Sequence, residues 1–135
     1  MNYWLLKSEP STWSWSDQVK VKQTMWEGVR NYQARNNLMA MKKNDKCFFY
    51  HSVKEKKIIG IVKIVKEFYS DPTDKTKKFV AVDVKIDRVF VRPVDLNQIK
   101  NDKRLFNIAL VRQSRLSVMP IDKKSWILIC KMGGL

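Results

Sequence analysis

Trp26 begins a short segment, residues 26–31, that interrupts the apolar periodicity of the chain and also contains Arg30 and Asn31. An aromatic ring beside a guanidinium and a carboxamide can stack on a nucleobase and hydrogen-bond to its edge. A tryptophan in a loop can also fill a gap in the hydrophobic core. The residue types favour base recognition, with a structural anchor as the alternative.

Polar residues interrupt apolar segments at three further places, where they supply hydrogen-bond donors and an acceptor. The pairs are Ser8 and Glu9, His51 and Ser52, and Arg115 and Ser117. A carboxylate such as that of Glu9 can accept from an exocyclic amine, as carboxylates do with cytosine N4. If these strand ends and loops converge on the segment around Trp26, they form one polar and aromatic pocket.

The sequence offers fewer residues suited to catalysis than to binding. His51 is the single histidine, and in a strand its neighbours Tyr50 and Ser52 point to the opposite face. A lone histidine in an apolar strand is more often a hydrogen-bonded structural residue than a catalytic base. None of the four glycines is spaced as in a phosphate-binding loop or a dinucleotide fingerprint. The sequence therefore predicts a binding module and not an enzyme.

The chain is strongly basic, with 27 Lys and Arg against 13 Asp and Glu in 135 residues and a formal net charge of +14. Such a charge attracts polyanions and gives salt-sensitive binding, so DNA or RNA is the predicted partner. The alternative is that the lysine clusters are only solvated surface.

Composition also excludes several classes of protein. Cys47 and Cys130 lie in apolar runs, as reduced thiols do in cytosolic proteins. A zinc site would need added carboxylates, so neither a metal nor another cofactor is expected. No stretch approaches the roughly 20 apolar residues of a membrane span, so no membrane association is expected. The predicted location is the cytoplasm of a bacterium or the nucleus of a eukaryote.

Short strands and capped helices are expected around these residues. Strands are predicted at residues 3–7, 47–52, 58–69, 80–90 and 115–118. Helices are predicted to begin after Ser14, Asn31, Asp95 and Asp122, whose side chains can cap a first turn. The pattern predicts an α+β fold, a small open and mostly antiparallel β-barrel flanked by short helices. No linker or repeat interrupts it, so residues 1–135 form one predicted domain.

Four blocks in register, spread over nearly the whole chain, resemble the EVE domain family. They are Tyr3–Pro10, Trp26–Asn37, Phe48–Ser52 and Arg115–Val118. The resemblance implies a PUA-like fold, a small mixed or antiparallel β-barrel with helices around it, similar to PUA, ASCH and YTH domains. It also implies a pocket that holds a modified base, such as a methylated or hydroxymethylated cytosine.

Carried onto this chain, the resemblance adds Lys7, Val29 and Tyr50 to the pocket. The full predicted base pocket is then Lys7, Ser8, Glu9, Trp26, Val29, Arg30, Asn31, Tyr50, His51, Ser52, Arg115 and Ser117. The chain departs from the family pattern at Ser11–Thr24, where relatives usually have one aromatic residue and a more acidic helix. That departure leaves the shape of one pocket wall open.

The leading hypothesis is a module that recognises a modified base in DNA or RNA. A general RNA-binding domain of the PUA kind is the first alternative. The second is an ASCH-like enzyme that acts on a modified nucleoside, with Lys7, Glu9 or His51 as acid or base. The third is an interaction domain whose charge is incidental. The sequence leaves the base, the polymer and the oligomeric state open.

Overall fold

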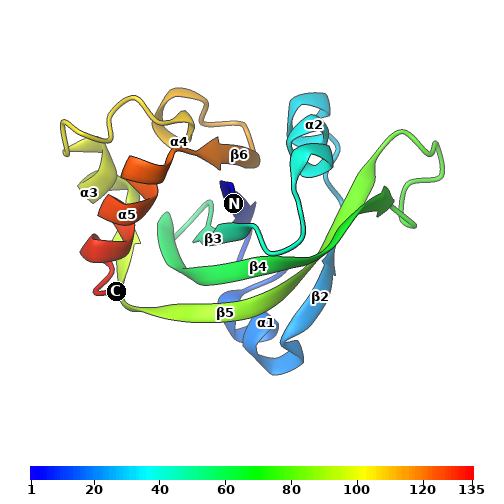
Figure 1. Cartoon of the computed structure of the whole chain (residues 1–135), viewed down its shortest axis with the longest axis horizontal. Helices are drawn as coiled ribbons and strands as arrows, with labels where there is room; N and C mark the ends of the chain where they lie inside the picture. Colours follow the sequence, from blue (N-terminus) through cyan, green and yellow to red (C-terminus); the bar gives the residue numbers. More distant parts are fainter.

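Six strands form one curved sheet in the order β2-β5-β4-β3-β1-β6 in the computed structural model, which describes residues 1–135. The strands are β1 (Tyr3–Ser8), β2 (Gln23–Trp26), β3 (Lys46–His51), β4 (Lys57–Ser70), β5 (Val80–Asp95) and β6 (Val118–Ile121). β1 and β3 run parallel, and all other neighbours are antiparallel. The sheet curls strongly, but its edge strands β2 and β6 do not pair with each other (Figure 1). The predicted α+β class and open barrel are confirmed.

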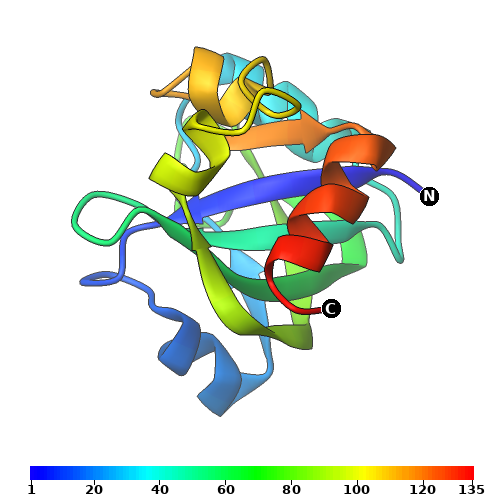
Figure 2. The same ribbon diagram turned by 90° about the vertical axis from the view of Figure 1, so that its left-hand side faces the viewer.

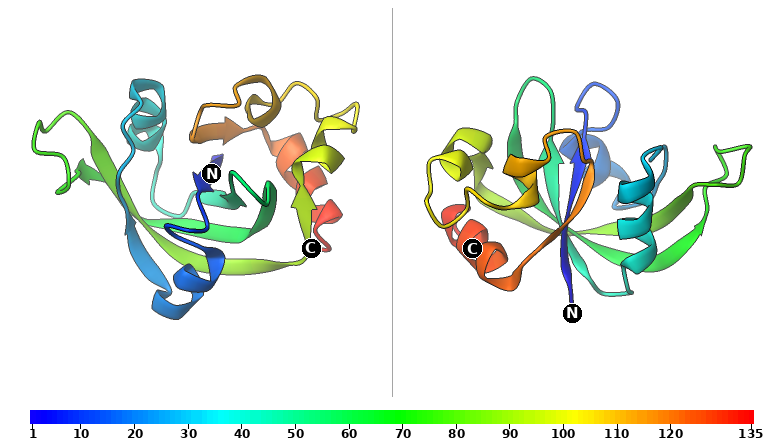
Figure 3. Two further views of the ribbon diagram at one scale, coloured as in Figure 1. Left: turned by 180° about the vertical axis from the view of Figure 1, so that it is seen from behind. Right: turned by 90° about the horizontal axis from the view of Figure 1, so that it is seen from above.

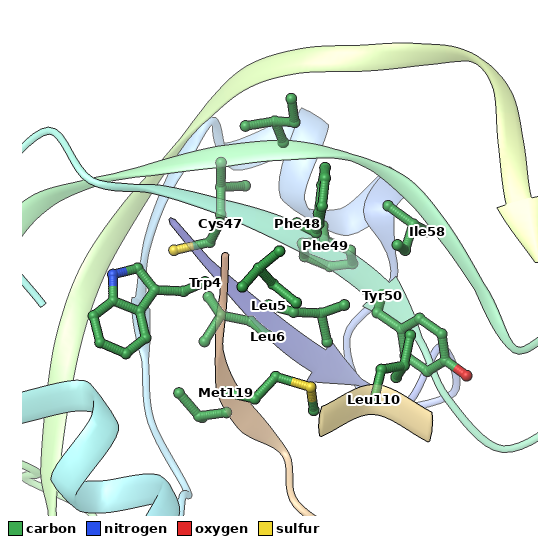
Figure 4. Packing of buried hydrophobic residues seen from close by; sticks show 14 of the residues in the cluster. Trp4, Leu5, Leu6, Cys47, Phe48, Phe49, Tyr50, Ile58, Leu110 and Met119 are labelled. Carbon is green, nitrogen blue, oxygen red and sulfur yellow. The ribbon is translucent and has the colours of Figure 1, made fainter. Parts of the chain in front are cut away.

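The middle strands of the sheet carry nearly continuous apolar runs, as strands covered on both faces do. Trp4, Leu5 and Leu6 of β1 are buried, and so is the run Cys47–Tyr50 of β3. Figure 4 shows Leu5 and Leu6 among the side chains of β3 and Met119 of β6. All of the buried apolar residues except Ala81 make one cluster of 31 residues. This core fixes the carboxyl end of β1, where the polar predicted site residues begin.

Five helices flank the sheet: α1 (Trp15–Val21), α2 (Tyr32–Ala40), α3 (Leu96–Lys100), α4 (Ala109–Arg112) and α5 (Lys123–Met132). Ser14, Asn31, Asp95 and Asp122 cap four of them, each accepting from the backbone N–H three residues further on. These caps confirm the predicted helix starts, because the capping bond is local and can be inferred from short spacing. Figure 2 shows α1 at the bottom of the curved sheet and α2 and α4 at the top.

The helix α1 approaches β4 closely at Gly60. A Cβ at this position would lie 2.6 Å from the ring of Trp15 and 2.7 Å from the carbonyl oxygen of Arg88. Such distances exclude any larger side chain, since a glycine in a strand often marks close approach of another group. The glycine therefore lets α1, and with it the segment before α1, sit directly against the sheet.

Three strands differ from the prediction. β5 continues to Asp95, five residues beyond its predicted end. The sequence does not predict β2, and Trp26 ends this edge strand instead of beginning an irregular loop. β2 exists because it pairs with β5, and Trp26 is opposite Val82 in that ladder. The last strand begins only at Val118, so Arg115 precedes it and Pro120 lies inside it. Proline is tolerated there because β6 is an edge strand.

Candidate functional site

A cavity of about 660 Å³ lies between the end of β1, the strand β2 and the loop that follows β2. It also includes Ser117, the residue before β6, so it lies beside the gap between the two unpaired edges of the sheet. Eight predicted site residues line it: Lys7, Ser8, Glu9, Trp26, Val29, Arg30, Asn31 and Ser117. The fold thus brings three segments that are distant in the sequence to one place.

Two tryptophans line the cavity, Trp26 and Trp13. Trp26 is 7% exposed, and its ring meets Phe49 edge-on with the ring centroids 5.5 Å apart. It therefore belongs to the core as well as to the cavity wall. Trp13 is half-buried, and its indole Nε1 donates to Oε1 of Gln18 at 2.9 Å. That hydrogen bond holds the second indole in a fixed orientation at the cavity.

The loop after β2, residues 27–31, is held by the carboxylate of Asp71 at the β4–β5 turn. Oδ2 of Asp71 accepts from the backbone N–H of Gly28 at 2.8 Å and from Nη1 of Arg30 at 3.1 Å. Oδ1 accepts from both the N–H and the hydroxyl of Thr73. Burial alone raises the pKa of Asp71, but the hydrogen bonds from Thr73, Gly28 and Arg30 outweigh it and lower the pKa. The loop is therefore tied to an ionised, buried carboxylate.

The end of β1 forms the opposite wall, and most of its polar groups are already engaged. Nζ of Lys7 donates to the carbonyl oxygen of Ser114 at 2.8 Å, and burial, with the nearby charge of Lys56, lowers the pKa of Lys7. The hydroxyl of Ser8 donates to the carbonyl oxygen of Trp13. Glu9 is exposed, and only one of its carboxylate oxygens accepts a hydrogen bond, from Ser11. Glu9 thus keeps an acceptor free at the cavity.

Four predicted residues lie outside this cavity: Tyr50, His51, Ser52 and Arg115. The phenol of Tyr50 is 2% exposed, and burial raises its pKa to about 12. Nε2 of His51 accepts from the backbone N–H of Trp15 at 3.0 Å, so this side chain anchors the start of α1. Burial is the main cause that lowers the pKa of His51. Arg115 is exposed and lines a smaller cavity of about 360 Å³, which shares Asn31 with the larger one.

The sequence missed several residues of the cavity wall: Thr12, Trp13, Thr24, Met25, Glu27 and Gly28. Three of them fall in Ser11–Thr24, where the chain departs from the family pattern. Trp13 lies directly before α1, and nothing in the local sequence distinguishes a tryptophan that anchors this helix from one that lines a cavity. The role of Asp71 is not predicted from the sequence either, because its partners Gly28 and Arg30 are more than 40 residues away.

A second cavity, of about 620 Å³, lies against α5 and has a different lining. Arg104, Lys124 and Lys131 contribute to it, together with apolar residues of α5, but no aromatic residue does. No group of three or more His, Cys, Asp or Glu side chains is placed to hold a metal ion. None of the helices is long and apolar enough to cross a bilayer. The cavity beside β2 is therefore the one that combines aromatic rings with the predicted polar groups.

The open, curled sheet with a cavity at its unpaired edges defines a domain of the PUA-like class. Its fold is similar to that of a YTH domain from Zygosaccharomyces rouxii, with a TM-score of 0.63 over 98% of this chain and 86% of that one at 14% identity. The chain belongs to the EVE domain family, whose model matches residues 2–132. The predicted family is thus confirmed.

Relatives in bacteria and animals cover almost all of the chain. The NMR structure of a Rhodopseudomonas palustris protein is 48% identical, with a TM-score of 0.94, and the match covers 99% of this chain and 94% of that one. Thymocyte nuclear protein 1 of Mus musculus is 37% identical over 97% of this chain and 73% of its own length. The human THYN1 protein, whose crystal structure is a complex with 5-methylcytosine-containing DNA, is 34% identical with a TM-score of 0.90 over 98% of both chains.

Proposed function

We propose that the cavity beside β2 holds a single modified nucleobase, 5-methylcytosine in DNA, after the base has left its stack. The observation that carries this proposal is the lining of the cavity: two tryptophans, the free carboxylate oxygen of Glu9 and the side chain of Asn31 in a space of about 660 Å³. This volume lies within the range of about 300–1,000 Å³ typical of small-molecule sites. The rings offer stacking surface, and Glu9 offers an acceptor for the cytosine amine.

The energetics set how selective such a site can be. Removing a base from its stack costs a few kcal/mol, and stacking on an aromatic side chain returns about 1–3 kcal/mol per base. Burying one methyl group contributes only about 0.8 kcal/mol, roughly a four-fold preference. Stronger selectivity for the methylated base needs a polar contact that favours it as well. We therefore expect a preference for 5-methylcytosine over cytosine of about three- to ten-fold.

The human relative supports this choice of ligand, since its crystal structure contains DNA with 5-methylcytosine and its identity to this chain is 34%. Two of the groups considered for catalysis are also engaged in the fold. Nε2 of His51 accepts from Trp15, and Nζ of Lys7 donates to Ser114. The proposal is therefore a binding domain without turnover, and a general RNA-binding domain is the outcome that the experiment below must separate from it.

The test is a fluorescence titration with matched oligonucleotides that differ at one position: cytosine, 5-methylcytosine, 5-hydroxymethylcytosine, adenine or N6-methyladenine. We expect tighter binding of the 5-methylcytosine strand at both low and high salt. Equal binding of all strands, with affinity lost in salt, would exclude recognition of a modification. Incubation with 5-methylcytidine, followed by chromatography, should return the nucleoside unchanged.

Trp13→Ala is the diagnostic variant, because Trp13 is only half-buried at the edge of the core and its removal should destabilise the fold less than removal of the buried Trp26. We expect it to weaken binding of the methylated strand about 5- to 150-fold, the value of one stacking contact. Ile127→Ala, at the exposed edge of the cavity on α5, is the matched control and should bind like the parent. Equal losses in both variants would place the binding site elsewhere.

A further inference from the structure

The turn between β4 and β5 projects beyond the rest of the molecule, next to α2. In Figure 1 this hairpin lies at the right end, and the view from above in Figure 3 shows it extending past α2. Lys75, Lys77 and Lys78 lie on its tip, and all three are exposed. None of them takes part in any of the four ion pairs of the protein. The tip therefore presents unpaired positive charge to the solvent.

The acidic residue of the tip is turned inward and organises the backbone that carries these lysines. Oδ1 of Asp74 accepts from the N–H and the hydroxyl of Thr76, at 2.9 and 2.6 Å. Oδ2 accepts from the N–H groups of Lys78 and Phe79, at 2.9 and 2.8 Å. These bonds, led by the one from the Thr76 hydroxyl, lower the pKa of Asp74 to about 2. The lysine backbone is thus fixed before any ligand arrives, which reduces the entropy lost on binding.

A continuous set of contacts joins the tip to the cavity. Nη1 of Arg35 on α2 donates to the carbonyl oxygen of Lys78 at 3.2 Å, and its guanidinium lies 4.8 Å from the ring of Tyr32. Tyr32 is 52% exposed, and its ring centroid lies 5.1 Å from that of Phe79. Arg30, which lines the cavity, donates to Thr73 at the base of the same turn. Cations therefore lie beside the exposed ring of Tyr32 and the half-buried ring of Phe79 along one path that leaves the cavity.

We propose that this hairpin surface, defined by Tyr32, Arg35, Lys75, Lys77 and Lys78, binds the phosphates and one flanking base of the strand whose modified base occupies the cavity. The inference rests on the proposed function and adds the direction in which the strand leaves the site. A basic surface interleaved with aromatic rings fits single-stranded nucleic acid, because phosphates pair with cations and any base can stack. An acidic protein would not need the exposed ring of Tyr32.

The experiment compares two triple variants with the same change in net charge. The test variant carries Lys75→Gln, Lys77→Gln and Lys78→Gln. The control carries Lys100→Gln, Lys103→Gln and Lys124→Gln, three exposed lysines in α3, shortly after α3 and in α5. These two helices lie at the end of the molecule opposite the hairpin in Figure 1. Affinity is measured against salt with a long oligonucleotide and with a trinucleotide, each containing one 5-methylcytosine. The trinucleotide has only two internucleotide phosphates, both next to the base in the cavity, so we expect it to leave the lysines of the hairpin tip unoccupied.

For the long strand, we expect the hairpin variant to reduce the slope of log K against log salt by up to about 2, since each lost phosphate contact on a single strand removes about 0.7. The control variant should change the slope by less than half as much. Trinucleotide binding, and the ratio between methylated and unmethylated strands, should stay the same in both variants. Equal slopes in the two variants, or a trinucleotide weakened by the hairpin variant, would overturn the inference.

The two proposals fail in different ways. Suppose that the parent does not distinguish methylated from unmethylated strands, but the hairpin variant alone has a smaller slope of log K against log salt. Then the modified-base function is wrong and the hairpin contact stands. If the parent keeps its preference for the methylated base but the hairpin variant behaves like the control, the cavity assignment stands and the hairpin contact is wrong.

Discussion

The cavity beside β2 and the tip of the β4–β5 hairpin are linked through Arg30, and they differ in what their side chains offer a ligand. The cavity presents two tryptophans and the free carboxylate oxygen of Glu9, while Nζ of Lys7 and the hydroxyl of Ser8 are already hydrogen-bonded within the protein. The tip presents three unpaired lysines on a backbone fixed by Asp74. Stacking and edge contacts discriminate between bases, whereas phosphate contacts do not. We therefore expect selectivity to depend on the cavity, and salt-sensitive affinity to depend on the tip.

Two carboxylates of the hairpin, three residues apart, stabilise the cavity and the tip separately. Asp71 and Asp74 are both buried, and each accepts from the N–H and hydroxyl of the threonine two residues on. Asp71 uses its other oxygen to hold the cavity loop at Gly28, while Asp74 uses its other oxygen for the tip. The same local motif thus supports two surfaces, and single substitutions can separate them.

The largest effect is expected from Trp26→Ala, because this side chain belongs to the core as well as to the cavity. Removing a buried tryptophan costs about 3–5 kcal/mol of the free energy of unfolding. Binding of the methylated trinucleotide should be lost, while the salt slope of the long strand stays at the parent value, since the lysines are untouched. Denaturant unfolding and salt titration measure the two quantities. A variant as stable as the parent that still selects 5-methylcytosine would contradict both roles of Trp26.

An intermediate effect is expected from Asp71→Ala. The substitution leaves the N–H of Gly28 and the guanidinium of Arg30 without their acceptor and should cost about 1–3 kcal/mol of stability. The cavity loop then has to become ordered when the ligand binds. We expect this to reduce the affinity for the methylated trinucleotide about ten-fold. Isothermal titration with the trinucleotide measures this loss.

Asp74→Ala is the matched control for Asp71→Ala. It lowers the melting temperature too, but it does not touch the cavity loop, so trinucleotide affinity should equal that of the parent. Long-strand affinity should fall, because the backbone of the tip lysines is no longer fixed. If both aspartate variants reduce trinucleotide affinity equally, the cavity and the tip form one cooperative unit, and the separate roles assigned to them are wrong.

Local chemistry explains which parts of this structure could be predicted from the sequence. The caps Ser14, Asn31, Asp95 and Asp122 were found because each bonds to a backbone N–H three residues away. The strand β2 was missed because only its ladder with β5, more than 50 residues further on, makes it a strand.

The residues of the candidate site also differ in whether the local sequence predicts them. Eight predicted residues line the cavity: six polar or aromatic residues that the sequence pattern indicates, and Lys7 and Val29, which the family resemblance adds. Trp13 and Asp71 could not be predicted, because their places there depend on tertiary contacts that leave no local pattern: Asp71 holds a loop 43 residues away. Whether the lining residues hold a base stays a prediction that the binding experiments test.

The smallest effect is expected from His51, which acts on the cavity only through α1. A neutral imidazole can accept from the N–H of Trp15, and a protonated one cannot. Burial lowers the pKa of His51 below 6.5, with Lys57 acting in the same direction and Glu55 opposing it, and Nδ1 has no hydrogen-bond partner. The unfolded chain therefore binds a proton at a higher pH than the folded one, and the free energy of unfolding falls as the pH drops below about 6.5.

The start of α1 should respond to acid first, since it depends on the bond from Trp15, and Trp13 lies directly before the helix. We expect faster amide exchange at Trp15 and a lower melting temperature between about pH 6.5 and pH 5, with no change at the hairpin tip, whose carboxylate titrates near pH 2. His51→Gln keeps an acceptor near the position of Nε2 but does not titrate, so its melting temperature should be flat over this range. If the melting temperature of His51→Gln still falls with pH, another group titrates, and the cavity wall does not depend on the protonation of this histidine.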